Sequence, residues 1–317
     1  MSDPVPSAED WPDIPYPAWA DTCSALHLMS QVVGKYALAR RPWLNHSWHA
    51  TFQVTASGLT TGLVPDARGI EAGFDFHQHH LLLRRVDGRS RILGLVPGTI
   101  ADFHRRFCEA VEALGGNSVF DRRPNELPDP VRFDADDRPR PYDADAVARF
   151  HRALVAAALA LQQFRTGFLG KASPVHFFWG SFDLAVTRFS GRRAPLHPGG
   201  IPYLPDAVTR EAYSHEVSSA GFWPGGGGIV DEPAFYSYAW PSPEGLAEAR
   251  VEPDSACFHP QLGEFILPYA AVRAAADPKA VLGRFLESSY RAAADLLGWD
   301  RSVLECAPGE PRRPRPL

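Results

Sequence analysis

Residues 70–96 read IEAGFDFHQHHLLLRRVDGRSRILGLV, and this stretch indicates the fold class. It predicts one strand from Ile70 to Arg85, a hairpin turn at Val86-Asp87-Gly88 and a short strand from Arg91 to Val96. Strands that follow one another so closely leave no room for a crossover helix, so they pair antiparallel. We therefore expect an α+β fold, with antiparallel sheets and flanking helices, rather than a doubly wound parallel sheet.

Helices and further strands flank this stretch on both sides. Hydrophobic periodicity predicts helices over residues 19–33, 99–114, 143–168 and 278–297. Further strands are predicted over residues 47–56, 118–121, 175–189, 213–223, 234–240 and 264–267. Residues 122–142 are rich in Pro, Asp and Arg and are expected to form an exposed linker, while residues 308–317 are expected to form a frayed tail.

The two halves of the chain resemble each other. Each starts with a helix that ends in Gly-Lys, at Gly34-Lys35 and at Gly170-Lys171, and continues with a strand that ends in Ser-Gly. Each half then has a His-bearing strand and closes with an amphipathic helix. This order favours a duplicated helix–strands–helix unit, with halves at about 19–121 and 143–300 inside a single compact domain over residues 1–317. Chance similarity between common elements is the alternative.

The charge balance excludes several classes of partner. Lys and Arg total 32 against 37 Asp and Glu, and this net charge of −5 leaves no basic surface for nucleic acid. No run approaches 18 apolar residues, so we expect no transmembrane helix and no membrane partner. Residues 1–17 contain no basic residue, unlike a signal peptide. The four scattered cysteines are expected to be free thiols, which indicates a cytoplasmic protein.

Two clusters of histidines are candidates for metal binding. In Asn45-His46-Ser47-Trp48-His49, an H-x-x-H pair could bind one metal ion. On a regular strand the two imidazoles would point to opposite sides, so a shared role needs a bulge or a loop position for His46. In the second cluster, His77 and His79 share one face of the strand predicted over residues 70–85. A structural or exposed role is the alternative for both clusters.

A third cluster, Tyr213-Ser214-His215-Glu216, precedes four glycines at residues 225–228. A His beside a carboxylate can act as a ligand plus base or as an oriented general base. The glycines would let a loop approach a ligand closely or move as a lid. A flexible surface turn is the alternative.

A fourth cluster lies in the apolar strand predicted within residues 171–192. Alternation places two sets of side chains on opposite faces: His176, Phe178, Phe182, Leu184, Val186 and Arg188 on one, and Trp179, Ser181, Asp183 and Thr187 on the other. Charged side chains in such a strand are costly to bury unpaired, so they either pair with each other or line a cavity. The tryptophans nearby suggest an aromatic-lined cavity, with ordinary core packing as the alternative.

The chain resembles a bacterial family of uncharacterised proteins that share a domain of unknown function. The resemblance covers roughly residues 10–300 and is carried by Asn45-His46-x-Trp48-His49, Ser173-Pro174-Val175-His176, Trp179-x-Ser181-Phe182-Asp183-Leu184-Ala185, Thr187-Arg188-Phe189-Ser190-Gly191, Tyr213-Ser214-His215-Glu216 and Gly221-Phe222-Trp223-Pro224-Gly225. Because the resemblance implies no reaction, substrate or cofactor, it assigns no catalytic residue. Its hallmark segments coincide with the clusters above, which favours one shared site.

We expect an enzyme that acts on a small molecule at a His-rich site between the two halves, with an oxidoreductase or a hydrolase as candidate classes. In the metal-dependent form, His46, His49 and His215 would bind one transition metal ion (Fe, Zn or Cu). The predicted catalytic residues are Glu216, His176 and Lys171, and the predicted substrate-binding residues are Lys35, Arg188, Trp179 and Trp223. The alternative is a metal-free binding protein for a small anionic or aromatic ligand. The sequence does not predict an oligomeric state.

Overall fold

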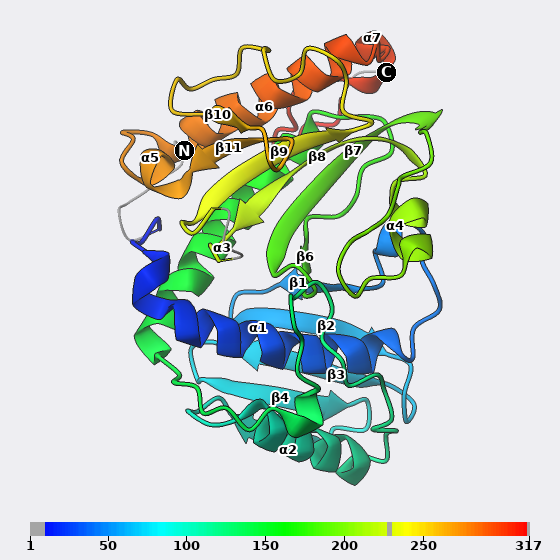
Figure 1. Ribbon diagram of the computed structural model, residues 1–317, viewed down its shortest axis with the longest axis vertical. Helices are drawn as coiled ribbons and strands as arrows, with labels where there is room; N and C mark the ends of the chain where they lie inside the picture. Colours follow the sequence, from blue (N-terminus) through cyan, green and yellow to red (C-terminus); the bar gives the residue numbers. More distant parts are fainter. Residues whose placement is uncertain (1–9, 227–229, 316–317) are drawn as a thin grey trace.

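The computed structural model describes residues 10–226 and 230–315. Their strands form one antiparallel sheet of eleven strands in the order β10-β11-β9-β8-β7-β6-β1-β2-β3-β4-β5 (Figure 1). The strands are β1 Thr51–Val54, β2 Gly58–Val64, β3 Ile70–Asp75, β4 His80–Arg85, β5 Ser90–Gly94, β6 His176–Phe178, β7 Asp183–Arg193, β8 His215–Trp223, β9 Ala234–Trp240, β10 Cys257–His259 and β11 Glu264–Pro268. The antiparallel α+β class predicted from residues 70–96 is confirmed.

Seven α-helices flank this sheet within the described residues: α1 Tyr16–Leu38, α2 Ile100–Ala113, α3 Ala144–Thr166, α4 Asp206–Ala212, α5 Tyr269–Arg273, α6 Pro278–Leu296 and α7 Arg301–Leu304. Two short 3₁₀ turns, η1 Asn45–Ser47 and η2 Phe133–Ala135, lie between them. Helix α1 packs against α2, α3 and β2 and crosses the middle of the molecule (Figure 1). No helix in the described ranges is long and apolar enough to cross a membrane.

The strand order runs outward from the central β1–β6 pair in both directions. On one side it reads β2, β3, β4 and β5, and on the other β7, β8 and β9, followed by β11 and β10. Each series is preceded by a long helix, α1 or α3, and followed by another, α2 or α6. This arrangement is compatible with a duplicated unit, although the duplication itself stays a prediction.

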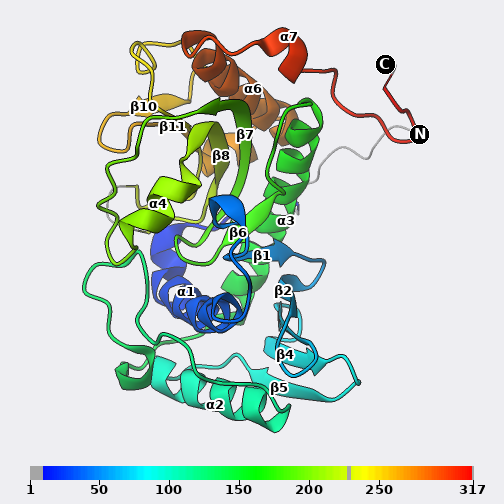
Figure 2. The ribbon, with the colours of Figure 1, turned by 90° about the vertical axis from the view of Figure 1, so that its right-hand side faces the viewer.

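Strand β7 separates two environments because its side chains alternate between the faces of the sheet. Leu184 and Val186 are fully buried on the face that α3 covers. Asp183 and Thr187 point to the opposite face, where they line a cavity. Figure 2 shows α3 and α4 on opposite sides of β7 and β8, so α4 lies on the cavity side.

Two predicted strands are each interrupted by a turn. Residues 70–85 form β3 and β4, because the Asp75 carboxylate accepts hydrogen bonds from the backbone N–H groups of His77 and Gln78 and closes a tight turn. His77 and His79 therefore lie on a turn, not on one strand face. Residues 175–189 form β6 and β7, with a turn between them where Phe182 has a φ of 60°.

Other predicted boundaries also differ from the structure. Helix α1 continues through Gly34-Lys35 instead of ending there, and residues 118–121 form no strand among the described residues. Helix α4 was not predicted, since it is only seven residues long. The ends predicted for α2, α3 and α6 agree with the structure to within one or two residues.

The expected linker and tail are both tied to the rest of the fold. Part of segment 122–142 lines the cavity, through Asn125 and Glu126. The tail hydrogen-bonds to the end of α3: the Gly309 N–H donates to the Thr166 hydroxyl at 2.8 Å, and Arg315 donates to the Thr166 carbonyl. The frayed tail expected from residue 308 is thus anchored as far as residue 315, and residues 316–317 lie outside the described ones.

Candidate functional site

A cavity of about 520 Å³ lies on the face of β7, β8 and β9 opposite α3. Its walls come from α1, the segment around η1, residues 121–126, the turn after β6, and residues 201–213 with α4. Aromatic side chains dominate the lining: Trp43, Trp48, Phe178, Trp179, Phe189, Tyr203, Tyr213, Tyr236 and Tyr238. Such a size and such a lining are typical of sites for small organic molecules.

Helix α1 organises the floor of the cavity through three neighbouring positions. The fully buried Gln31 amide donates to the carbonyls of Asn125 and Gly180 at 2.9 and 3.2 Å and accepts from the Asn125 N–H at 2.8 Å. Gly34 makes room for Trp179, since a Cβ at Gly34 would lie 2.3 Å from the indole ring. These contacts hold two distant loops against one helix.

Lys35 completes this floor as a buried, paired cation. Its ammonium donates to the Asp121 carboxylate and to the Asn125 side-chain carbonyl, both at 2.8 Å. The Lys35 side chain is 4% exposed, whereas that of Asp121 is 70% exposed. Burial lowers the pKa of Lys35, and the hydrogen bond to Asp121 opposes that shift. The Lys35 charge is therefore already neutralised inside the protein.

Two carboxyl groups line the cavity without a cationic partner. Asp183 accepts hydrogen bonds from the hydroxyl groups of Ser181 and Tyr236. Glu126 lies against Gly180, where its Oε1 is 2.2 Å from the position that a Cβ would take. Within the described part of the chain, no hydrogen bond or ion pair reaches the Glu126 carboxyl group. Glu126 thus has a free carboxyl group in an aromatic cavity.

Burial shifts the acid–base behaviour of these groups. Burial, with a further contribution from the nearby Asp183, raises the pKa of Glu126 to about 7, and Lys35 opposes this shift. Burial also raises the pKa of Asp183, against the effect of its two hydroxyl donors. On the strand β11, burial and Asp183 raise the pKa of Glu264 to about 7. A carboxyl group that titrates near neutrality can take up or release a proton under physiological conditions.

Three tyrosines form a row beside these carboxyl groups. Tyr236 and Tyr238 stack with their ring centroids 6.1 Å apart, and the Tyr213 and Tyr238 hydroxyls lie 2.8 Å apart. Tyr236 lies over Gly221 on the paired strand β8, where a Cβ would be 2.4 Å from its hydroxyl. Gly221 is therefore required for the close approach of this ring.

The cavity lining also contains His46, in a strained backbone conformation with a φ of 58°. Its backbone N–H donates to the Glu211 carboxylate at 2.9 Å, and its Nδ1 lies 2.8 Å from the Ala212 carbonyl. Because a carbonyl only accepts, Nδ1 carries the proton and Nε2 accepts from the Lys171 ammonium at 2.5 Å. Lys171 lies 4.8 Å above the Phe189 ring, and burial lowers its pKa.

The three predicted metal ligands do not form a cluster. The ring centroids of His46 and His215 are 5.9 Å apart, and His215 Nδ1 lies 3.1 Å from the Ser214 hydroxyl. His49 Nδ1 contacts the backbone of Leu44. Across residues 10–226 and 230–315, no three His, Cys, Asp or Glu side chains lie where they could hold a metal ion. Metal binding therefore stays a prediction without geometric support.

Several other predicted site residues lie away from the cavity. Glu216 pairs with Arg192 at 2.8 Å. His176 is buried, and desolvation lowers its pKa to about 3. Neither of these side chains lines the cavity, nor does Trp223 or Lys171, although Lys171 contacts His46. Of the predicted site residues, Lys35, His46, His49 and Trp179 line the cavity. Gly227 and Gly228 of the predicted glycine loop lie outside the described residues.

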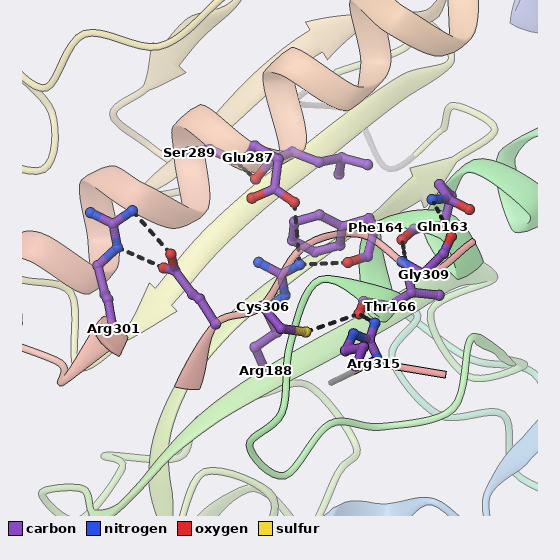
Figure 3. A network of polar contacts seen from close by, with 12 residues as sticks. Gln163, Phe164, Thr166, Arg188, Glu287, Ser289, Arg301, Cys306, Gly309 and Arg315 are labelled. Atoms are coloured by element: carbon purple, nitrogen blue, oxygen red, sulfur yellow. Dashed lines mark hydrogen bonds and ion pairs between the residues drawn. The ribbon is translucent and has the colours of Figure 1, made fainter. Parts of the chain in front are cut away.

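Arg188 faces the other side of β7. Figure 3 shows it against Phe164, and its guanidinium carbon lies 3.5 Å from the centroid of that ring and 4.3 Å from that of Tyr290. Its terminal nitrogen donates to the Phe164 carbonyl and contacts Glu287 at 3.3 Å. Arg188 is 1% exposed. It is part of the core between β7, α3 and α6, and its position gives no support to the predicted role in substrate binding.

Sequence patterns did not predict that Glu126, Asn125 and Gln31 belong to the site. Asn125 and Glu126 lie in the segment predicted to be a linker, and Gln31 shares one face of α1 with His27 and Lys35. The residues around Glu126 show no apolar periodicity, so no local pattern indicates that this side chain lies in a cavity. A polar residue on a buried helix face is costly without a partner. The position of Gln31 on such a face therefore indicates a buried hydrogen bond.

The comparisons with known proteins give a family and no function. A family of unknown function, DUF5996, matches residues 11–306. Neither the curated proteins nor the solved structures contain a match.

Proposed function

The chain belongs to DUF5996, a family of unknown function, so we propose a function from its cavity: an enzyme that acts on a small molecule by proton transfer. The observation that carries the proposal is the free Glu126 carboxyl group in a cavity of about 520 Å³ with aromatic walls. Gln31 hydrogen-bonds to the backbone of Asn125, the residue before Glu126, which supports a role in binding or catalysis rather than a solvated surface position.

In this proposal Glu126 is the proton-transfer residue. Its carboxylate accepts a proton from an acidic C–H, N–H or O–H group of the bound molecule and returns it to another atom of that molecule or to solvent. A base with a pKa near 7 is well suited to this step, because it is substantially ionised at neutral pH and its conjugate acid is still a proton donor. Asp183, held by Ser181 and Tyr236, orients the polar part of the molecule.

The proposed chemistry uses no metal ion. A metal-dependent enzyme with His46, His49 and His215 as ligands would require side-chain movements that bring the three imidazoles together. We place the metal-free activity in the cytoplasm, as the free cysteines suggest. A binding protein without turnover is the second candidate, favoured by the aromatic lining alone.

Ligand binding is tested with N-phenyl-1-naphthylamine, a neutral fluorophore that brightens in apolar sites. The wild type is expected to bind it, and Ala185→Phe on the cavity wall is expected to weaken binding at least tenfold, because the new ring fills the cavity. Ile92→Phe on the exposed edge strand β5 adds a ring of the same kind outside the cavity and should leave binding unchanged. Equal binding by the wild type and Ala185→Phe would contradict the proposal.

Catalysis is tested on small metabolites that displace this fluorophore. Each is incubated with the protein in D₂O, and solvent deuterium incorporation or turnover is followed by NMR. We expect Glu126→Gln to lower the rate by about 10²- to 10⁴-fold while displacement persists. If every displacing molecule stays unchanged with the wild type, the protein is a binding protein and the enzymatic part of the proposal is wrong.

A further inference from the structure

Carboxyl groups outnumber cations around the cavity. Its ionisable lining comprises one lysine, Lys35, and three acidic residues, Asp121, Glu126 and Asp183, besides His46 and His49. The Lys35 ammonium forms its ion pair with Asp121, at 2.8 Å. Burial lowers the pKa of both histidines, which favours their neutral forms. Among the described residues no ion pair reaches Glu126 or Asp183, and Lys35, which acts electrostatically on Glu126, is paired with Asp121.

A third carboxyl group, on the strand β11 that pairs with β9, reinforces this imbalance. Glu264 on β11 acts electrostatically on Asp183 and on the three tyrosines of the row, and no salt bridge reaches it within the described ranges. Buried carboxylates without a cation are costly, so they take up protons or bind a positive group. The raised pKa of Glu126 and Glu264 is the first of these responses in the unliganded protein.

The aromatic walls favour the same kind of ligand. The Tyr236 hydroxyl donates to Asp183 and the Tyr213 and Tyr238 hydroxyls bond to each other, so these hydroxyls already have partners, and the Tyr213 ring stacks on His197 with the centroids 4.8 Å apart. The face of an aromatic ring carries negative potential and attracts ammonium groups. Trp179 adds an indole, the ring that binds cations best, to the same cavity.

We infer that the ligand of this cavity is a small organic cation, a protonated amine or a quaternary ammonium joined to an apolar ring. Its positive group lies between Asp183, Glu126 and the tyrosine row, and its ring lies among the aromatic side chains. The inference rests on the proposed function, because it names the ligand class of the same cavity. It replaces the anionic ligand expected from Lys35, Lys171 and Arg188, since Lys35 is already paired, Lys171 contacts His46 outside the cavity lining and Arg188 lies on the other face of β7.

A bare metal ion fits the site less well than an organic cation. No cluster of three suitable donors exists in the described chain, whereas a single ammonium needs only one or two carboxylates and ring faces. The volume of about 520 Å³ is also that of an organic molecule rather than of an ion.

The test compares ligands of similar shape and different charge by displacement of N-phenyl-1-naphthylamine. The three probes are 2-phenylethylamine, 3-phenylpropionate and n-propylbenzene, which are cationic, anionic and neutral at pH 7.5. We expect the amine to displace the fluorophore at a concentration at least tenfold lower than either isostere. Equal or better displacement by the carboxylate or the hydrocarbon would overturn the inference.

Variants of the two carboxyl groups locate the cation. Glu126→Gln and Asp183→Asn are each expected to weaken displacement by the amine at least fivefold and to leave displacement by n-propylbenzene unchanged. Glu109→Gln, on the exposed face of α2, is the matched control and should change neither. Because Asp183→Asn can perturb folding, Glu126→Gln alone decides the outcome: unchanged amine affinity in this variant would contradict the inference.

The pH dependence provides an independent readout. The groups that face Glu126 and Asp183 are Lys35 from α1, Asp121 from the same loop, Tyr236 from β9 and, electrostatically, Glu264 from β11. A bound cation competes with the protons on these acids, so (2-phenylethyl)trimethylammonium, whose charge is permanent, should bind about tenfold more tightly at pH 8 than at pH 6. Affinity that is constant or falls over this range would contradict the inference.

The two proposals fail in different ways. If the fluorophore does not enter the cavity, the proposed function fails and no ligand class is tested. If the fluorophore binds and Ala185→Phe excludes it, but the amine has no advantage over its isosteres, only the cation inference is wrong.

Discussion

Glu126 is the residue on which the site depends most. Its backbone has a φ of 59°, and its N–H donates to the Pro202 carbonyl at 3.2 Å, so the loop holds it in a conformation that a non-glycine residue rarely adopts. Strain of this kind persists only where surrounding contacts impose it. The contacts of Gln31 and Lys35 with Asn125, its neighbour in sequence, supply that restraint.

A single substitution at this residue should change how stability depends on pH. A carboxyl group whose pKa is about 7 in the folded protein binds a proton more tightly there than in the unfolded chain. Its stabilising contribution is complete below its ordinary pKa and is lost as pH rises towards 7 and above. Glu126→Gln keeps the neutral form, so its gain in unfolding free energy over the wild type should grow by on the order of 2 kcal/mol between pH 5 and 8.

Urea unfolding at both pH values measures this gain. Glu109→Gln on the surface of α2 is the control, with an expected change within about 0.5 kcal/mol at either pH. A gain for Glu126→Gln that is equal at pH 5 and pH 8 would show that Glu126 is ionised in the folded protein throughout.

At the scale of elements, helix α1 joins the two halves of the molecule. Its interior glycine costs about 1 kcal/mol of helix stability relative to alanine. The indole of Trp179, from the turn between β6 and β7, packs against the bare backbone at Gly34 and offsets that cost. The Gly34-Lys35 pair is therefore a packing and pairing motif within a helix rather than a helix end.

Gly34→Ala should consequently destabilise the protein although alanine is the better helix former. The added methyl group would lie 2.3 Å from the Trp179 ring, and displacing a buried indole costs about 1–3 kcal/mol. Gly283→Ala in α6 is the matched control: no atom lies within 4 Å of its new methyl group, so a gain of about 0.5–1 kcal/mol is expected. Urea midpoints of the two variants should shift in opposite directions, and a stabilised Gly34→Ala would rule out the close approach of Trp179.

At the scale of the whole molecule, the two predicted halves share one sheet and one cavity. The β1–β6 pair joins them, with Thr51 opposite Phe178 and Phe52 opposite Phe177. The cavity draws Lys35 from one half, Asp183 from the other and Glu126 from the segment between them. Neither half can complete the site alone.

We therefore expect the two halves to unfold together. Thermal unfolding followed by far-ultraviolet circular dichroism and by tryptophan fluorescence should give coincident single transitions, because the shared sheet couples their stabilities. Two transitions separated by more than a few degrees would show that the halves fold independently.

The sequence by itself determined the class and most elements of this fold. Short spacing between strands excludes crossover helices, and helix periodicity with the N-caps Thr99 and Asp143 sets the starts of α2 and α3. Strand spacing, helix periodicity and N-caps are local properties, so they can be inferred without knowing which distant residues pack together. The same local logic placed Asp183 and Thr187 on one face of β7, where the structure has them.

Only the tertiary structure decided which polar residues share a site. Alternation along β7 places Arg188 on the face away from the cavity, but one of the two helices that cover this face, α6, is distant in sequence. Glu126 lies in the cavity because Gln31, far earlier in the chain, hydrogen-bonds to the backbone of Asn125, the residue before Glu126. Local sequence encodes the period of an element, whereas a site is made by long-range packing, which brings together residues that carry no shared local pattern.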